Sequence, residues 1–171
     1  MLRKISLGLL IVGFILVGVN AAMSADYIGS SKCKICHKGD AKGKVFEIWA
    51  ETKHAKSMES LKAKGEDKNP SCLACHSTGY GKPTGYGADS TKFEALGNVG
   101  CESCHGPGSA YSKMAVMQDH AKAVEAGMIV PDEKTCITCH NEKSPTFNKE
   151  KPFKFAEMVK MIEHKSPKKG Q

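Results

Sequence analysis

The chain has 171 residues, of which 40% are hydrophobic and 25% are charged, and its formal net charge is +7. Arg3 and Lys4 supply two of these charges, and the first 25 residues hold no acid, so residues 26–171 keep +5 of the +7. Such a chain is long enough for one compact domain rather than several. The composition gives no support to nucleic-acid binding.

The first 25 residues have the pattern of a secretory signal peptide. Residues 1–4 form a short basic segment. Residues 5–19 are apolar or glycine apart from one serine, and residues 20–25 are mostly small. The apolar stretch spans 15 residues, against about 20 needed to cross a bilayer as a helix. We therefore expect cleavage after residues 1–25, no stable membrane anchor, and export of residues 26–171 to the periplasm as a single domain.

Four Cys-x-x-Cys-His motifs follow in order and contain all eight cysteines of the chain. Two thiols three residues apart lie on one turn of a helix and can each add across a vinyl group of one haem, with the next histidine under the iron. Neutral imidazole is a good axial ligand of haem iron. The motifs therefore predict four covalently attached haem c groups. The binding cysteines are Cys33, Cys36, Cys72, Cys75, Cys101, Cys104, Cys136 and Cys139, and the proximal ligands are His37, His76, His105 and His140.

The cysteine pairs alone would also suit two structural zinc ions, because all-cysteine zinc sites use the same two-residue gap, or disulfides. The histidines argue against both alternatives. Only 7 of the 171 residues are histidine, so four at the same offset by chance has a probability on the order of a few in a million. Export also suits haem attachment, because free thiol pairs outside the cytoplasm would otherwise oxidise.

Four haems in residues 26–171 leave about 36 residues for each haem, too few for a separate apolar core around each macrocycle. The haems would then form much of the interior and lie close enough to exchange electrons. We expect a mainly α fold, a small multihaem cytochrome c with short helices and long irregular loops organised around four covalently bound haems.

Three helices are predicted between and after the motifs, from apolar residues at spacings of three and four. They span residues 45–64, 109–126 and 153–165. No strand-like alternation of useful length is present. Residues 79–100, rich in glycine, tyrosine and serine and containing Pro83, are predicted to be an irregular loop.

Each predicted helix carries one of the three histidines that lie outside the motifs. These are His54, His120 and His164. A histidine on an apolar face is commonly a core residue, but four irons with open sixth positions favour a role as distal ligand. Spacing alone does not pair the three with particular haems. The fourth iron is left to a methionine, water, a lysine or no ligand, and we favour a five-coordinate or weakly ligated iron.

Three further stretches have distinctive sequences. They are residues 97–108 (Gly-Asn-Val-Gly-Cys-Glu-Ser-Cys-His-Gly-Pro-Gly), residues 54–61 (His-Ala-Lys-Ser-Met-Glu-Ser-Leu) and residues 153–160 (Phe-Lys-Phe-Ala-Glu-Met-Val-Lys). With the four motifs in order, they resemble the tetrahaem cytochrome c-554 family, whose members accept electrons from hydroxylamine oxidoreductase in ammonia-oxidising bacteria. The resemblance covers most of the chain after residue 25.

The resemblance implies which histidines share an iron. The implied distal and proximal pairs are His54 with His105, His120 with His37, and His164 with His140. The haem at His76 would then be five-coordinate. In the family a hydrophobic loop residue shields the open iron, and residues 144–147 (Ser-Pro-Thr-Phe) are the local candidate, although an ordinary turn after the fourth motif explains them equally well.

Periplasmic electron transfer is the predicted function, with three bis-His haems and one open haem shuttling electrons between a redox donor and an acceptor. Six-coordinate irons bind no substrate. The resemblance implies a hydroxylamine oxidoreductase-like donor and another cytochrome c as acceptor. The alternative is an enzyme that reduces nitric oxide or a related small ligand at the haem held by His76. No acid/base pair can be assigned there, so no catalytic residue is predicted. A sensing module is a third hypothesis, but nothing resembles an output domain.

Overall fold

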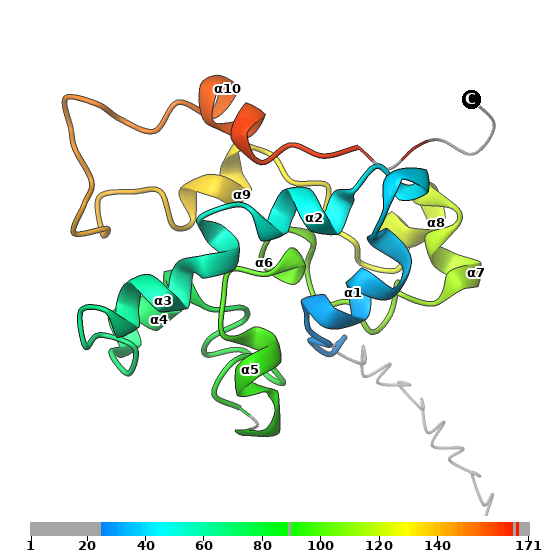
Figure 1. Ribbon diagram of the computed structural model, residues 1–171, viewed down its shortest axis with the longest axis horizontal. Helices are drawn as coiled ribbons and strands as arrows, with labels where there is room; N and C mark the ends of the chain where they lie inside the picture. The colour runs from blue at the N-terminus through cyan, green and yellow to red at the C-terminus, as the bar shows by residue number, and fades with distance from the viewer. Residues whose placement is uncertain (1–24, 89, 166, 168–171) are drawn as a thin grey trace, which may run out of the picture.

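A computed structural model describes residues 25–88, 90–165 and 167 of the chain. The predicted signal peptide lies outside the described residues except for its last position. Every regular element within the described ranges is helical, and Figure 1 shows short helices joined by long loops. This confirms the predicted mainly α fold. No helix among these elements has the length and apolar character needed to span a membrane.

The elements follow one another as short segments of one to two turns. The α-helices are α1 (Ser30–His37), α2 (Val45–Ala50), α3 (Ser57–Lys62), α4 (Pro70–His76), α5 (Phe93–Leu96), α6 (Cys101–His105), α7 (Met114–Met117), α8 (His120–Glu125), α9 (Glu133–Ile137) and α10 (Phe155–Met158). The 3-10 turns are η1 (Asp40–Lys42), η2 (His54–Lys56), η3 (Ser90–Lys92) and η4 (Val159–Met161).

The three predicted helices are present, but each is interrupted. Residues 45–64 divide into α2, η2 and α3, because the Thr52 hydroxyl donates to the Trp49 carbonyl at 2.7 Å and accepts from the Ala55 N–H at 3.3 Å. Residues 109–126 divide into α7 and α8, because the Asp119 carboxylate caps the second helix. Short polar side chains of this kind compete with the helical hydrogen bonds.

The other two predicted segments also differ in detail from the structure. Residues 153–165 form α10 and η4, and the regular structure ends before His164. The predicted irregular loop at residues 79–100 contains η3 and α5, so it is partly helical.

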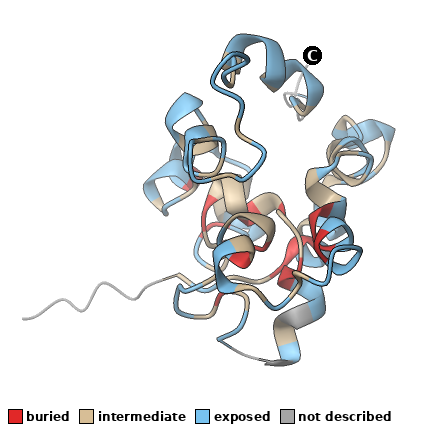
Figure 2. Ribbon diagram, turned by 90° about the vertical axis from the view of Figure 1, so that its left-hand side faces the viewer, coloured by how far each residue is buried: buried red, intermediate tan, exposed pale blue. Residues whose placement is uncertain are grey.

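The protein core is small and lies between residues 29 and 123. The buried hydrophobic residues are Met58, Leu61, Leu73, Leu96, Tyr111 and Ala123. Three of them form one cluster where α3 packs on α4. No residue from 124 onward is buried in the described part of the chain, and Figure 2 shows the buried residues gathered in the middle of the molecule. So small a core leaves most of the interior to a cofactor of large apolar surface.

Candidate haem sites

Three of the four motifs lie on helices that end at the motif histidine. The helices α1, α4 and α6 end at His37, His76 and His105. In each motif the two cysteines and the histidine are at positions i, i+3 and i+4 and therefore share a helix face. The start of α4 is fixed by Pro70 at its first position and by the Asn69 side chain, which accepts from the Ser71 N–H at 3.0 Å.

The fourth motif begins on α9 and extends beyond it. Asp132 and Thr135 form a capping box at the start of this helix, which ends at Ile137. The Asn141 amide donates to the Ile137 carbonyl at 2.8 Å and closes the last turn. The His140 N–H still donates to the Cys136 carbonyl at 3.0 Å. This histidine therefore keeps the one-turn spacing that the other three motifs have within a helix.

Contacts between the motif cysteines set the motifs in a row. Before haem attachment, the hydrogen bond that the Cys33 thiol donates to Cys101 is the main cause that raises the pKa of Cys33 and lowers that of Cys101, so the first and third motifs lie together. Burial, followed by the charge and hydrogen bond of Cys139, raises the pKa of Cys75 to about 11, which places the second motif beside the fourth.

The third and fourth motifs are also neighbours. Burial, followed by the charges of Cys136 and Cys139, raises the pKa of Cys104 to about 11. The spatial order of the motifs is therefore second, fourth, third, first, and neighbours in space are not neighbours in sequence.

Two pairs of histidines have the separation expected of two axial ligands on one iron. The ring centroids of His54 and His140 are 6.0 Å apart, and those of His105 and His164 are 6.1 Å apart. Two metal–nitrogen bonds of about 2 Å, with about 1.1 Å from each nitrogen to its ring centroid, give about 6.2 Å. The residues fit a haem iron between the two rings of each pair.

These partners differ from the pairs that the family resemblance implied. His54 lies opposite His140 rather than His105, and His164 lies opposite His105 rather than His140. The end of the chain explains the difference. After α10 it runs back toward α1 (Figure 1), and the Lys165 carbonyl oxygen lies against Gly43, where only a residue without a Cβ atom leaves room for it. The last histidine is thus carried away from the fourth motif, which precedes it in sequence.

Electrostatic interactions link each pair to one more ring, with His76 near His54 and His37 near His164. Burial, and then the charges of His140 and His76, lowers the pKa of His54. Burial, and then the charge of His164, lowers the pKa of His37. Because the neutral form of imidazole is the one that ligates a metal, this burial favours the state that a haem iron requires.

Backbone carbonyls orient three of the rings. The Nδ1 atoms of His76, His105 and His164 lie 3.0–3.1 Å from carbonyl oxygens of Ser57, Ile129 and Ile162, respectively. Since a carbonyl can only accept, each Nδ1 carries the proton and leaves the Nε2 lone pair for a metal. The Nδ1 atom of His37 is buried and has no hydrogen-bond partner among the described residues.

His120 is the one candidate distal ligand that the described structure does not bring to another histidine. It is the first residue of α8 and is exposed. No ring contact in the described chain joins it to a second histidine, so its implied pairing with His37 stays a prediction.

The segment predicted to shield the open iron lies beside the fourth motif. Ser144, Thr146 and Phe147 line an open cleft of about 550 Å³ together with His140. Phe153, which sequence reasoning did not select, stacks on the His140 ring with centroids 4.7 Å apart and planes at 17°. No ring contact joins Phe147 to His76 in the described chain, and shielding of that haem stays a prediction.

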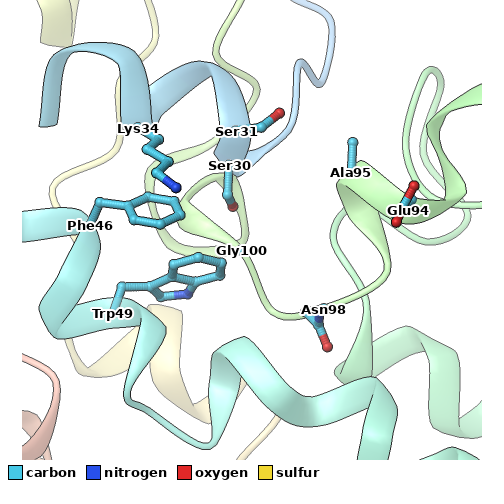
Figure 3. A pocket seen from close by; sticks show the side chains of 9 residues that line it. All are labelled: Ser30, Ser31, Lys34, Phe46, Trp49, Glu94, Ala95, Asn98 and Gly100. Atoms are coloured by element: carbon cyan, nitrogen blue, oxygen red, sulfur yellow. The ribbon is translucent and has the colours of Figure 1, made fainter. Parts of the chain in front are cut away.

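A second cavity, of about 230 Å³, lies between α1, α2 and α5 (Figure 3), and none of the predicted haem ligands is among its lining residues. Its wall includes Phe46 and Trp49, and the Lys34 ammonium lies 5.0 Å from the centroid of the Phe46 ring. The Trp49 indole N–H donates to the Val99 carbonyl at 3.0 Å. This bond ties α2 to the start of the third motif and so helps to place His54 on the following turn.

A family model, a related sequence and a solved structure all match this chain, and all three describe the same kind of protein. A family model described as cytochrome c554 and c-prime matches residues 32–106. Cytochrome c-554 of Nitrosomonas europaea is 32% identical over 186 aligned positions, which cover 85% of this chain and 77% of that protein. The solved structure of reduced cytochrome c554 from Nitrosomonas europaea matches with a TM-score of 0.61 at 31% identity, covering 80% of this chain and 83% of that one.

Proposed function

Because this chain belongs to the cytochrome c554 family of multihaem electron-transfer proteins, we propose that it is a periplasmic carrier with three bis-His haems and one five-coordinate haem. Four covalently attached haem c groups are the cofactors of the family, and the eight cysteines match that number. Each bound haem c supplies a one-electron iron couple whose potential depends on its axial ligands and surroundings.

The observation that carries the ligand assignment is the separation of about 6 Å within each histidine pair. His54 and His140 are proposed to hold the fourth iron, and His105 and His164 the third. The remaining distal histidine, His120, is assigned to the first iron by the family resemblance. His76 then has no histidine partner.

The polypeptide orients the proximal histidine rings and sets the order of the motifs in space. The carbonyls of Ser57 and Ile129 hold the proximal rings of the second and third motifs, so these rings need little rearrangement when the iron changes charge. The row of motifs, from second through fourth and third to first, supports transfer between two ends of the molecule. A donor and an acceptor could therefore dock on different faces. A hydroxylamine oxidoreductase-like enzyme as donor and another cytochrome c as acceptor are proposed from the resemblance.

An electron paramagnetic resonance count of the purified protein, with and without nitric oxide, tests this function. Three low-spin irons and one high-spin iron that binds nitric oxide are expected. Four low-spin irons inert to nitric oxide would contradict the open position at His76. Nitric oxide turnover, measured in the same preparation with a chemical reductant, decides whether the open haem is also a reductase.

Electron transfer itself needs a second measurement. Stopped-flow mixing of the reduced protein with an oxidised cytochrome c should reoxidise all four haems, because the motifs form a continuous row. Rates should fall as salt rises, since contacts between charged surfaces of redox partners are screened. Reoxidation of only part of the haems would contradict a continuous path.

A further inference from the structure

Glu102 is the one side chain of the Asp, Glu, Lys, Arg and His types that is buried in the described part of the chain, at 2% exposure. It lies between the two cysteines of the third motif, on α6. Lys, Arg, Asp and Glu are almost never fully buried unless something compensates their charge. None of the described lysines forms an ion pair with Glu102, so the compensation must come from another source.

Three backbone N–H groups supply that compensation. Glu102 Oε1 accepts from Gly108 at 2.6 Å and from Ile28 at 2.9 Å. Its Oε2 accepts from Gly29 at 2.7 Å and, in a longer contact, from Ile28 at 3.2 Å. All of these groups are donors, and a carboxylate that only accepts is suited to the ionised form. The structure therefore builds a fixed negative charge into its interior.

This charge lies between the attachment points of two haems. Gly29 directly precedes α1, which carries the first motif, and the Cys33 sulfur is 4.0 Å from the Gly29 carbonyl oxygen. Cys101 adjoins Glu102 in sequence. After the hydrogen bond between the two thiols, which raises the pKa of Cys33 and lowers that of Cys101, the negative charge of Glu102 makes a smaller contribution that acts to raise both, so its field reaches the first and third motifs.

We propose that Glu102 is a buried anion that lowers the reduction potentials of the first and third haems relative to the fourth. A ferric haem carries one more positive charge than a ferrous haem, so a nearby negative charge stabilises the oxidised state, and it does so more strongly where water is excluded. Glu102 would act through this field and through its hold on residues 28 and 29, as a positioning residue rather than an axial ligand. The proposal rests on the haem attachment described above.

Spectroelectrochemical titration of the purified protein with four haems tests the proposal, with two variants of Glu102. In Glu102→Gln, two of the four transitions should move to higher potential. The reduction equilibrium constant of each should rise by about tenfold or more, which corresponds to about 59 mV for one electron. Glu102→Asp keeps the charge but shortens the side chain, and should leave both transitions near their original positions. If Asp and Gln shift the potentials equally, the role is structural and the proposal is wrong.

Glu94→Gln is the matched control. Glu94 is an exposed acid on α5 that lines the cavity beside α1. Its charge is screened by water, so its removal should leave all four transitions unchanged. Four equal shifts in Glu102→Gln, or none, would overturn the proposal.

The wild-type protein provides a test that does not depend on how the variants fold. Assignment of the potentials to individual haems by nuclear magnetic resonance should place the third haem below the fourth, although both are bis-His. The reverse order would overturn the proposal. The count of low-spin irons is not expected to change in Glu102→Gln, so a failure of the ligand assignment would be seen separately from a failure of this inference.

Discussion

Residues 25–129, here called the body, and residues 130–165, here called the arm, are held in place by different forces. All buried residues described in the chain lie in the body. Hydrogen bonds there join distant segments, as when the Met58 N–H donates to the Asn98 side chain at 2.9 Å or the Ile28 N–H donates to Glu102. The arm has no buried residue in its described part, and its N–H and O–H hydrogen bonds join residues at most four positions apart.

The two histidine pairs connect these regions. Each pair takes one ring from the body and one from the arm, His54 with His140 and His105 with His164. In the body the polypeptide fixes the position of the ligands. In the arm, where no core exists, ligation to iron and packing on haem would fix the polypeptide.

Removal of the fourth haem should have the largest effect on how the arm is held against the body. In a Cys136→Ala/Cys139→Ala variant the arm loses its attachment at His140 and keeps only the one at His164. Its cleavage by a protease should accelerate by about tenfold or more, because cleavage follows the population of the open form. Limited proteolysis with mass spectrometry of the fragments measures this. The control is Cys72→Ala/Cys75→Ala, which removes a haem of the body and should leave the fourth haem holding the arm. Equal cleavage of the arm in both variants would show that it does not depend on the fourth haem.

A hydrogen-bonded carboxylate of the body should contribute far more to the free energy of unfolding than an exposed ion pair of the arm. Glu102→Ala leaves three N–H groups without their acceptor, two of them buried and one partly buried, and we expect a loss of about 3 kcal/mol in the free energy of unfolding. Glu157→Ala removes an exposed ion pair with Lys154, a contact of a kind that contributes about 0–1 kcal/mol. Urea unfolding followed by circular dichroism compares the two. Similar losses would contradict the division between body and arm.

Loss of the capping box at the start of the arm should lower the melting temperature by a smaller amount that depends on pH. Hydrogen bonds from the Thr135 backbone, and then lesser contributions from its side chain and from Lys134, lower the pKa of Asp132 below 3.8. Because the folded pKa is below the unfolded value, the stabilisation is present above about pH 3.8 and is lost as pH falls through the folded pKa. The difference in melting temperature between the wild type and Asp132→Ala should thus shrink on acidification. A constant difference between pH 6 and pH 2.5 would show that the carboxylate charge is not involved.

The sequence predicts the composition of the site better than its geometry. The Cys-x-x-Cys-His spacing depends on local helix geometry, and the structure places three of the four motifs on helices that end at the histidine. Which motif histidine lies opposite His54, and which lies opposite His164, depends on where the end of the chain crosses the molecule, at Gly43. No local pattern encodes that crossing.

Two further features could not be predicted for related reasons. The helices are interrupted at Thr52 and Asp119 because these side chains accept hydrogen bonds from nearby backbone N–H groups. The apolar pattern of the sequence does not reveal such bonds. Glu102 stands in the most distinctive stretch of the sequence, but its burial depends on residues 28 and 29, more than 70 positions away. The apolar periodicity of single segments contains no information about such contacts.

A count of low-spin irons in two double variants tests the central claim most directly. If His54 and His140 share an iron, then His54→Ala/His140→Ala disrupts one centre and lowers the count from three to two. The matched variant His54→Ala/His105→Ala disrupts two centres and lowers the count to one. The opposite pattern, one low-spin iron left in the first variant and two in the second, would show that His54 and His105 share the iron, and would contradict the link between body and arm.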